Sequence, residues 1–357
     1  MEAPSYFVDF LQDIRPTEQQ RESLRNGHIE LRERIDDYEP LKPAIVTTFL
    51  QGSYRRATAL RPAPKRRSDV DIIVVTKLHE DEYTPSEALE LFRPFVEKYY
   101  KGEYRIQGRS IGISKKHVDL DLVITSAPPE QVMGILPEEG ERDDSLEEET
   151  QVQQLKEAAR SALWKDEPLR IPDREAQRWE VTHPLAQLTW TREKNAATNG
   201  HFVNVVKAIK WWRYNQHPDA EQPRGYPLER IVAECCPDGI TSVAEGVTKT
   251  FEEIVSRFAT GKPILPDHGC HPDVLQRITR QEFHVFHGDV AGAARLARRA
   301  LDAEELESSV TLWRDLFGDK FPSAPPPGKD GKGGGGAAGG FTPRNEVSTV
   351  PGTGRFA

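Results

Sequence analysis

Four aspartates carry the most distinctive chemistry of this sequence. Asp69 and Asp71 flank a single valine, and Asp119 and Asp121 flank a single leucine, each pair within an apolar stretch. Side chains two apart on a strand project from the same face, so each pair would bring two carboxylates together. Like charges held in an apolar strand repel each other and are costly to desolvate unless a cation is bound. Carboxylate oxygens are ligands that Mg²⁺ prefers.

The segment Gln51-Gly52-Ser53 could hold phosphate. It directly follows a short apolar stretch, 44–50, that we expect to be a strand. Glycine lets the backbone approach a phosphate closely, and the serine hydroxyl with adjacent N–H groups can hold β- and γ-phosphates. Residues 54–68 contain no acid and six basic side chains that suit a triphosphate: Arg55, Arg56, Arg61, Lys65, Arg66 and Arg67.

Together these groups indicate two-metal nucleotidyl transfer. In that reaction a hydroxyl attacks an α-phosphorus and pyrophosphate leaves, with two divalent ions roughly 4 Å apart on the attacking and leaving oxygens. We predict that Asp69 and Asp71 bind two Mg²⁺ ions and that a third carboxylate comes from a neighbouring strand. Asp119 and Asp121 share one strand face, so the spacing leaves both open as the third ligand.

A helix expected over 201–214 could contribute cations. Its apolar residues fall on one face, and Lys207 and Lys210 share another. A pair of solvated lysines is the competing interpretation, above all for Lys207. Lys210 directly precedes two tryptophans and is the favoured contact for a phosphate or an acceptor nucleotide.

The first 125 residues alternate helices with strands around these groups, which predicts an α/β (α+β) fold. Thr17 with Gln20 can form a capping box, and Thr84-Pro85 is a strong helix start. Helices are expected over 17–37 and 84–100, with a kink at Pro94, and strands over 44–50, 70–76, 104–106, 112–114 and 118–125.

The rest of the chain divides into a helical part and a tail. From residue 151 the pattern is mostly helical, and the clearest later helices are expected over 241–260, 272–277, 282–302 and 304–317. After Phe321 the proline- and glycine-rich sequence cannot bury apolar surface and should be a flexible tether. We therefore predict a catalytic core over 1–190, a helical domain over 191–321 and a tail over 322–357.

Composition limits the class of protein. The chain has 357 residues, and no stretch approaches the ~20 apolar residues that span a bilayer. Its net charge of −9 disfavours general binding of duplex nucleic acid, whose phosphates demand clustered cations. Few cysteines and no secretion signal fit a cytoplasmic protein. We expect Cys235, Cys236 and Cys270 to be buried thiols rather than zinc ligands.

These motifs resemble the polymerase-β-like nucleotidyltransferases. More narrowly they resemble the bacterial CD-NTases, the cyclic-oligonucleotide synthases related to cyclic GMP-AMP synthase and oligoadenylate synthetase. The resemblance covers nearly the whole chain. It is carried by QGSYRRAT (51–58), DVD (69–71) and Asp121, and, for clade D of that family, by TTFLQGS (47–53), GRSIGIS (108–114), LDLVIT (120–125), THPLAQLTWTREKN (182–195), KWWR (210–213), GYPLE (225–229) and the terminal GRFA (354–357).

The resemblance implies a bilobed enzyme with a mixed β-sheet in its catalytic core and a C-terminal helical domain for the acceptor nucleotide and base selection. It implies that ATP and GTP are joined with Mg²⁺, by successive 3′–5′ transfers, into a cyclic di- or trinucleotide. A 3′,3′,3′-cyclic purine trinucleotide would be in character for clade D. The product would activate an effector in CBASS antiphage defence.

The resemblance also assigns residues. Asp69, Asp71 and Asp121 would hold the metal ions, and LDLV favours Asp121 over Asp119. Ser53, with Gln51 and Gly52, would bind phosphate, and Lys210 would contact nucleotide. Some relatives occur in operons with ubiquitin-ligase-like enzymes that conjugate their C-terminal residue. The tail ending in Ala357 resembles such a substrate, so an E1/E2-like enzyme is an expected partner.

Two other functions stay open. An enzyme of the same superfamily could extend RNA 3′ ends, but that activity favours a basic surface, against which the net charge of −9 speaks. A non-catalytic nucleotide-binding module is the third interpretation. The full set of three metal-binding carboxylates speaks against it.

Overall fold

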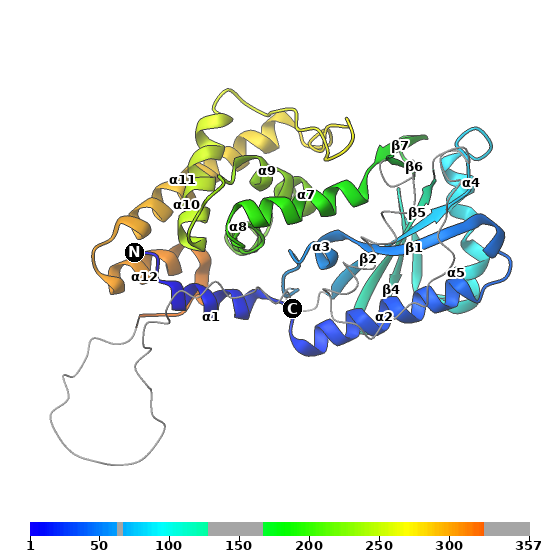
Figure 1. Cartoon of the computed structure of the whole chain (residues 1–357), viewed down its shortest axis with the longest axis horizontal. Helices are drawn as coiled ribbons and strands as arrows, with labels where there is room; N and C mark the ends of the chain where they lie inside the picture. The colour runs from blue at the N-terminus through cyan, green and yellow to red at the C-terminus, as the bar shows by residue number, and fades with distance from the viewer. Residues whose placement is uncertain (63–66, 128–166, 325–357) are drawn as a thin grey trace, which may run out of the picture.

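The structure is a computed structural model that describes residues 1–62, 67–127 and 167–324 (Figure 1). Several features singled out in the sequence lie outside the described residues. These are Lys65 and Arg66 of the basic run, residues 151–166 of the part expected to be mostly helical, and the tail from 325 to Ala357.

A mixed sheet carries the aspartates. Strand β1 (Ile45–Gln51) pairs antiparallel with β2 (Ser68–Thr76), and β2 pairs parallel with β5 (Val118–Ser126). The remaining pairings are antiparallel, with β4 and β3 following β5 and the β6–β7 hairpin joined to its end: β3 (Tyr104–Ile106), β4 (Ile111–Ser114), β6 (Leu169–Asp173) and β7 (Arg178–Thr182). The predicted combination of a mixed sheet with helices is confirmed.

Helices cover one face of this sheet (Figure 1). Helix α2 (Glu18–Asp36) begins with the capping box predicted for Thr17 and Gln20, and its apolar side chains share a core with β2 and β5. The kink expected at Pro94 is instead a break at Leu91–Phe92 between two short helices, α4 (Pro85–Glu90) and α5 (Arg93–Tyr99). A proline at the second position of α5 starts a new helix there.

Helices make up most of the other half of the molecule (Figure 1). They are α7 (Pro184–Ala197), α8 (Phe202–Gln216), α9 (Gly225–Cys235), α10 (Val243–Arg257), α11 (Arg280–Asp302), α12 (Leu306–Phe317) and a final 3₁₀ turn (Gly318–Lys320). No helix of the described residues is long and apolar enough to cross a membrane.

Helix α1 (Pro4–Ile14), which the sequence analysis did not predict, packs into this helical half. Phe10 stacks on Phe317 with ring centroids 4.6 Å apart, and Phe7 lies edge-on to Trp313 at 5.0 Å. The first residues therefore share a core with the last helices. The predicted division into residues 1–190 and 191–321 stays a prediction, and its boundary falls inside α7.

Two parts of the helical prediction are wrong. The β6–β7 hairpin lies in the region expected to be mostly helical, because pairing with the end of β5 and between its own strands stabilises two very short strands. Residues 272–277 form no helix: Asp273 pairs with Pro266 in an isolated β-bridge, and turns follow at 274–277. There the Asp273 carboxylate accepts hydrogen bonds from the backbone N–H groups of Leu265 and Leu275, both at 3.0 Å, and this local bonding competes with a helix.

Candidate active site

The four aspartates lie side by side on one face of the sheet. In the parallel ladder Asp69 is opposite Asp119 and Asp71 is opposite Asp121. Paired residues of neighbouring strands project to the same face, so all four carboxyl groups share it. The intervening valine and leucine point into the core on the opposite face. The sheet therefore brings together two pairs of carboxylates that are about 50 residues apart in the sequence.

Burial and neighbouring like charges raise the pKa of two of these carboxyl groups. Burial, followed by the charges of Asp121 and Asp69, raises the pKa of Asp71 to about 7, although Arg56 acts to lower it. Burial, followed by Asp69 and Asp119, raises the pKa of Asp121 to about 6. The face therefore carries more negative charge than the neighbouring side chains compensate, and a bound cation would relieve it.

The environments of Asp119 and Asp121 differ. Asp119 Oδ1 lies 3.0 Å from Arg67 Nε, so this carboxylate already has a cationic partner. Asp121 Oδ1 accepts a hydrogen bond from the neutral amide of Gln107 at 3.2 Å. An uncompensated carboxylate is the better metal ligand, which favours Asp121. The assignment of the third ligand stays a prediction.

The donor set fits Mg²⁺ by residue type and surplus charge. Within the described residues, however, no three His, Cys, Asp or Glu side chains are already gathered as a metal-binding cluster. The three cysteines are buried free thiols, as predicted.

The predicted phosphate loop lies directly against this face. Gly52 begins the short helix α3 (Gly52–Arg55) at the end of β1, with a backbone φ of +79°. A Cβ atom at Gly52 would lie 1.7 Å from Asp71 Oδ2. Only glycine therefore fits, both for its left-handed backbone and for the carboxylate beside it. Ser53 follows and is half-buried.

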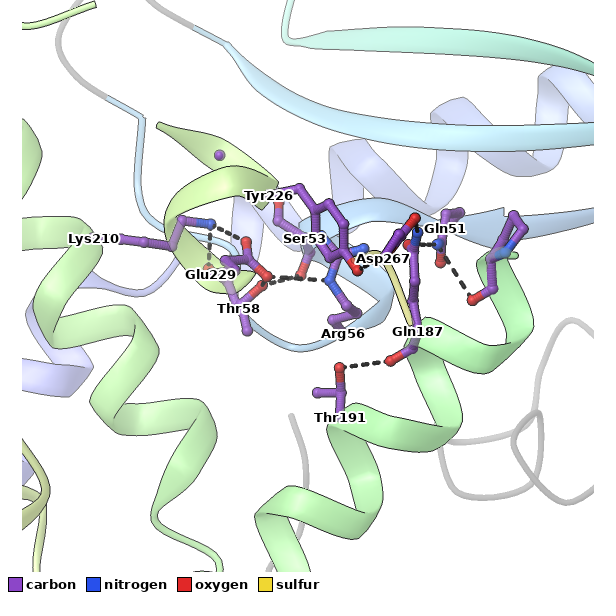
Figure 2. Close-up of polar contacts among 12 residues, drawn as sticks. Gln51, Ser53, Arg56, Thr58, Gln187, Thr191, Lys210, Tyr226, Glu229 and Asp267 are labelled. Atoms are coloured by element: carbon purple, nitrogen blue, oxygen red, sulfur yellow. Dashed lines mark hydrogen bonds and ion pairs between the residues drawn. The ribbon is translucent and has the colours of Figure 1, made fainter. Parts of the chain in front are cut away.

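The side chain of Gln51 is turned away from this loop. Its Nε2 donates to Gln187 Oε1 at 2.7 Å and to the Pro184 carbonyl at 3.4 Å, both on α7 (Figure 2). Gln51 is thus engaged within the protein, and its predicted role in binding nucleotide stays a prediction.

The solvated interpretation of the two lysines on α8 is wrong, because α9 and the loop after α3 cover that face. Lys207 and Lys210 are only 5% and 4% exposed. Lys210 Nζ donates to Glu229 Oε1 at 2.7 Å and to the Thr58 carbonyl at 3.0 Å (Figure 2). The predicted nucleotide contact of Lys210 remains untested, and in this structure its ammonium binds protein oxygens.

Glu229 was not among the predicted site residues. It lies on α9 at the centre of a buried cluster with Arg56, Thr58 and Lys210 (Figure 2). Arg56, one of the basic residues expected to suit a triphosphate, instead pairs with Glu229, and its guanidinium lies 4.9 Å over the Tyr226 ring. The sequence holds one signal for this: Glu229 stands directly beside Leu228, among the apolar residues of α9.

Comparison with known proteins identifies the family. Residues 1–125 match the model of the Second Messenger Oligonucleotide or Dinucleotide Synthetase domain. The chain is 42% identical to a cyclic AMP-AMP-GMP synthase of Enterobacter hormaechei subsp. hoffmannii, with 100% of both chains covered. It is 27% identical to a cyclic AMP-AMP-AMP synthase of an Acinetobacter strain, covering 90% of this chain and 86% of the relative.

A solved structure has the same fold at low identity. The structure of E. coli MS115-1 CdnC with ATP matches with a TM-score of 0.66 and 16% identity, covering 90% of this chain and 100% of CdnC. Fold, carboxylate face and relatives together define a nucleotidyltransferase. The chain belongs to the bacterial CD-NTases, the family of nucleotidyltransferases that make cyclic oligonucleotides.

Proposed function

We propose that this chain makes a cyclic purine trinucleotide from ATP and GTP by two-metal nucleotidyl transfer. The observation that carries the proposal is the parallel register that sets Asp71 opposite Asp121, with Gly52 packed against Asp71. This arrangement places a surface that attracts cations directly beside a backbone that can receive phosphate.

The residues would divide the work as follows. Asp69, Asp71 and Asp121 would hold two Mg²⁺ ions, and bound Mg²⁺ would activate the attacking hydroxyl and stabilise the leaving oxygen. The N–H groups and hydroxyl of Gly52–Ser53 would hold the β- and γ-phosphates. Lys210, with Lys207 beside it, would contribute positive charge on the nucleotide side.

The relatives support a trinucleotide product. The Enterobacter relative is named for two adenosines and one guanosine, and the Acinetobacter relative for three adenosines. ATP would serve as substrate in either case, and GTP in the first. At 42% identity over the full length, the mixed AMP-AMP-GMP product is the one we propose.

The biological setting is proposed from the family resemblance. The enzyme would belong to clade D, act in the cytoplasm, and signal through a cyclic nucleotide to an effector of CBASS antiphage defence. An E1/E2-like enzyme would conjugate Ala357. Deleting the last residues of the tail should abolish that conjugation and leave synthesis in vitro intact, and unchanged conjugation of the shortened chain would refute it.

The decisive experiment identifies the products. The protein is incubated with the four ribonucleoside triphosphates and Mg²⁺, treated with phosphatase, and the products are weighed by mass spectrometry. We expect a phosphatase-resistant cyclic trinucleotide, absent for the double variant Asp69→Ala, Asp71→Ala. Elongation of added RNA would instead support the RNA-extending alternative. Nucleotide binding without turnover would support the non-catalytic module.

A further inference from the structure

A buried ionic cluster joins the phosphate loop to the helical half of the molecule (Figure 2). The Glu229 carboxylate accepts three hydrogen bonds, from Arg56 Nε at 3.1 Å, Thr58 Oγ1 at 2.9 Å and Lys210 Nζ at 2.7 Å. None of the four residues is more than 8% exposed. The cluster thus connects α8 and α9 with the segment that follows α3.

The charges in this cluster show that Glu229 is ionised. Burial acts to raise the pKa of Glu229, but the charges of Lys210 and Arg56 and their hydrogen bonds lower it to about 2. A fully buried ion cluster pays a large desolvation cost, and well-packed apolar side chains often stabilise a protein as well or better. A reason other than stability is therefore needed for placing three charged groups here.

The cluster reaches the phosphate loop through the backbone. The Thr58 N–H donates to the Ser53 carbonyl at 2.9 Å, and the Arg56 N–H donates to the Gly52 carbonyl at 3.0 Å. The two residues of this segment that Glu229 binds are therefore also the residues that hold the backbone of Gly52 and Ser53.

We propose that Glu229 is a positioning residue for nucleotidyl transfer, which holds Arg56 and Thr58 from the helical half and thereby fixes the Gly52–Ser53 backbone against the carboxylate face. The proposal rests on the proposed function. Gly52 lies so close to Asp71 that no Cβ atom fits between them. A shift of the loop would weaken its hydrogen bonds to the bound phosphates. It would also move the phosphates relative to the carboxylates, where a misplacement of about 1 Å can cost a hundredfold in rate.

The test compares three single variants. Glu229→Gln keeps the shape of the side chain and removes its charge. Thr58→Val removes the hydroxyl that donates to Glu229 and keeps the backbone N–H that donates to Ser53. Arg277→Gln is the matched control, because Arg277 pairs across to Asp173 of β6 and has no contact with the loop. Each variant is measured for thermal stability, for kcat and KM with ATP, and for the Kd of a nonhydrolysable ATP analogue.

We expect Glu229→Gln to raise both KM and Kd at least about tenfold, Thr58→Val to raise them less, and Arg277→Gln to lower thermal stability alone. A purely structural role would reduce the amount of active enzyme, and so kcat, at unchanged KM and Kd. Wild-type KM and Kd in folded Glu229→Gln and Thr58→Val would overturn the proposal, as would an equal rise in Arg277→Gln.

Failure of this proposal can be told apart from failure of the proposed function. If Glu229→Gln does not fold, KM and Kd of Thr58→Val test the proposal instead. If the wild-type protein makes no cyclic product, the proposed function fails. The Kd of the analogue then still shows whether Glu229 positions the loop.

Discussion

The two clusters of charge that flank the phosphate loop are built in opposite ways. On the sheet, four aspartates lie side by side on one face, and the pKa of Asp71 and of Asp121 is raised. On the helical side, Glu229 lies between two cations and its pKa is lowered. The negative charge of the first cluster is not balanced by neighbouring cations, whereas the negative charge of the second cluster is balanced by cations within the protein. Only the first therefore calls for an external ligand.

The sharpest test of this difference is made within the sheet cluster. Asp121→Asn should reduce synthesis at least about a hundredfold, because substituting even the partners of metal ligands costs 10–100-fold. Asp119→Asn should reduce it far less, since Asp119 is paired with Arg67. The measurement is the initial rate of cyclic product formation at saturating Mg²⁺ for each of the two variants. The reverse ranking would make Asp119 the third ligand.

The same isosteric change should have opposite effects on stability in the two clusters. Glu229→Gln should lower the free energy of unfolding by about 3–5 kcal/mol, because it leaves two buried cations without an anion. Asp71→Asn should leave the metal-free protein as stable or more stable, because it removes a repelling charge. Thermal unfolding in the presence of a chelator compares them. Equal losses in both variants would show that the sheet cluster is also internally compensated.

Mg²⁺ should bind more weakly as the pH falls. At pH 6, one unit below its raised pKa of about 7, only about a tenth of Asp71 would be ionised. Metal has to displace these protons, so we expect Kd to rise at least about tenfold from pH 8 to pH 6. Calorimetric titration with MgCl₂ at each pH measures this Kd. Asp71→Asn, which cannot titrate at this position, should bind weakly at both pH values.

In the metal-free protein the pH dependence of folding stability has the opposite direction to that of Mg²⁺ binding. The stability that a raised carboxyl pKa contributes is present at low pH and is lost as the pH rises through about 7. His28 and His268 act in the opposite direction, because burial lowers the pKa of each to about 4. The Asp71 contribution is therefore obtained as the difference between wild type and Asp71→Asn at each pH.

The smallest effect is expected where the loop is held by neutral groups. Gln187→Ala removes the partner of the Gln51 amide and a donor to Asp267. The neutral bond to Gln51 contributes about 1 kcal/mol and the bond to the Asp267 carboxylate about 1.5 kcal/mol or more, so stability should fall by about 2–3 kcal/mol. KM for ATP should change less than in Glu229→Gln, as steady-state kinetics would show. A larger rise in KM than in Glu229→Gln would show that Gln51, and not Glu229, is the main residue that holds the loop.

The carboxylate face could be predicted because local patterns determine it. Two-residue spacing in apolar strands sets which face Asp69 and Asp71 share, and a small-residue turn after β1 marks the loop. The Glu229 cluster could not be predicted in the same way. Its partners Arg56 and Lys210 come from distant segments, and only tertiary packing decides whether a charged residue is solvated or buried. For the same reason the sequence left open whether the lysines of α8 are solvated, and the structure shows them buried.

The packing of α1 has a consequence for how the protein can be made. Its aromatic residues Phe7 and Phe10 complete their core only with α12 and the turn that follows it, around Phe317. During synthesis, helices α8 and α10, on which α1 also packs, emerge earlier, but the aromatic partners of α1 in α12 emerge only after nearly the whole described chain. A chain shortened before 306 would leave those rings uncovered and prone to aggregate, whereas one that stops after 324 keeps every partner of α1 described above.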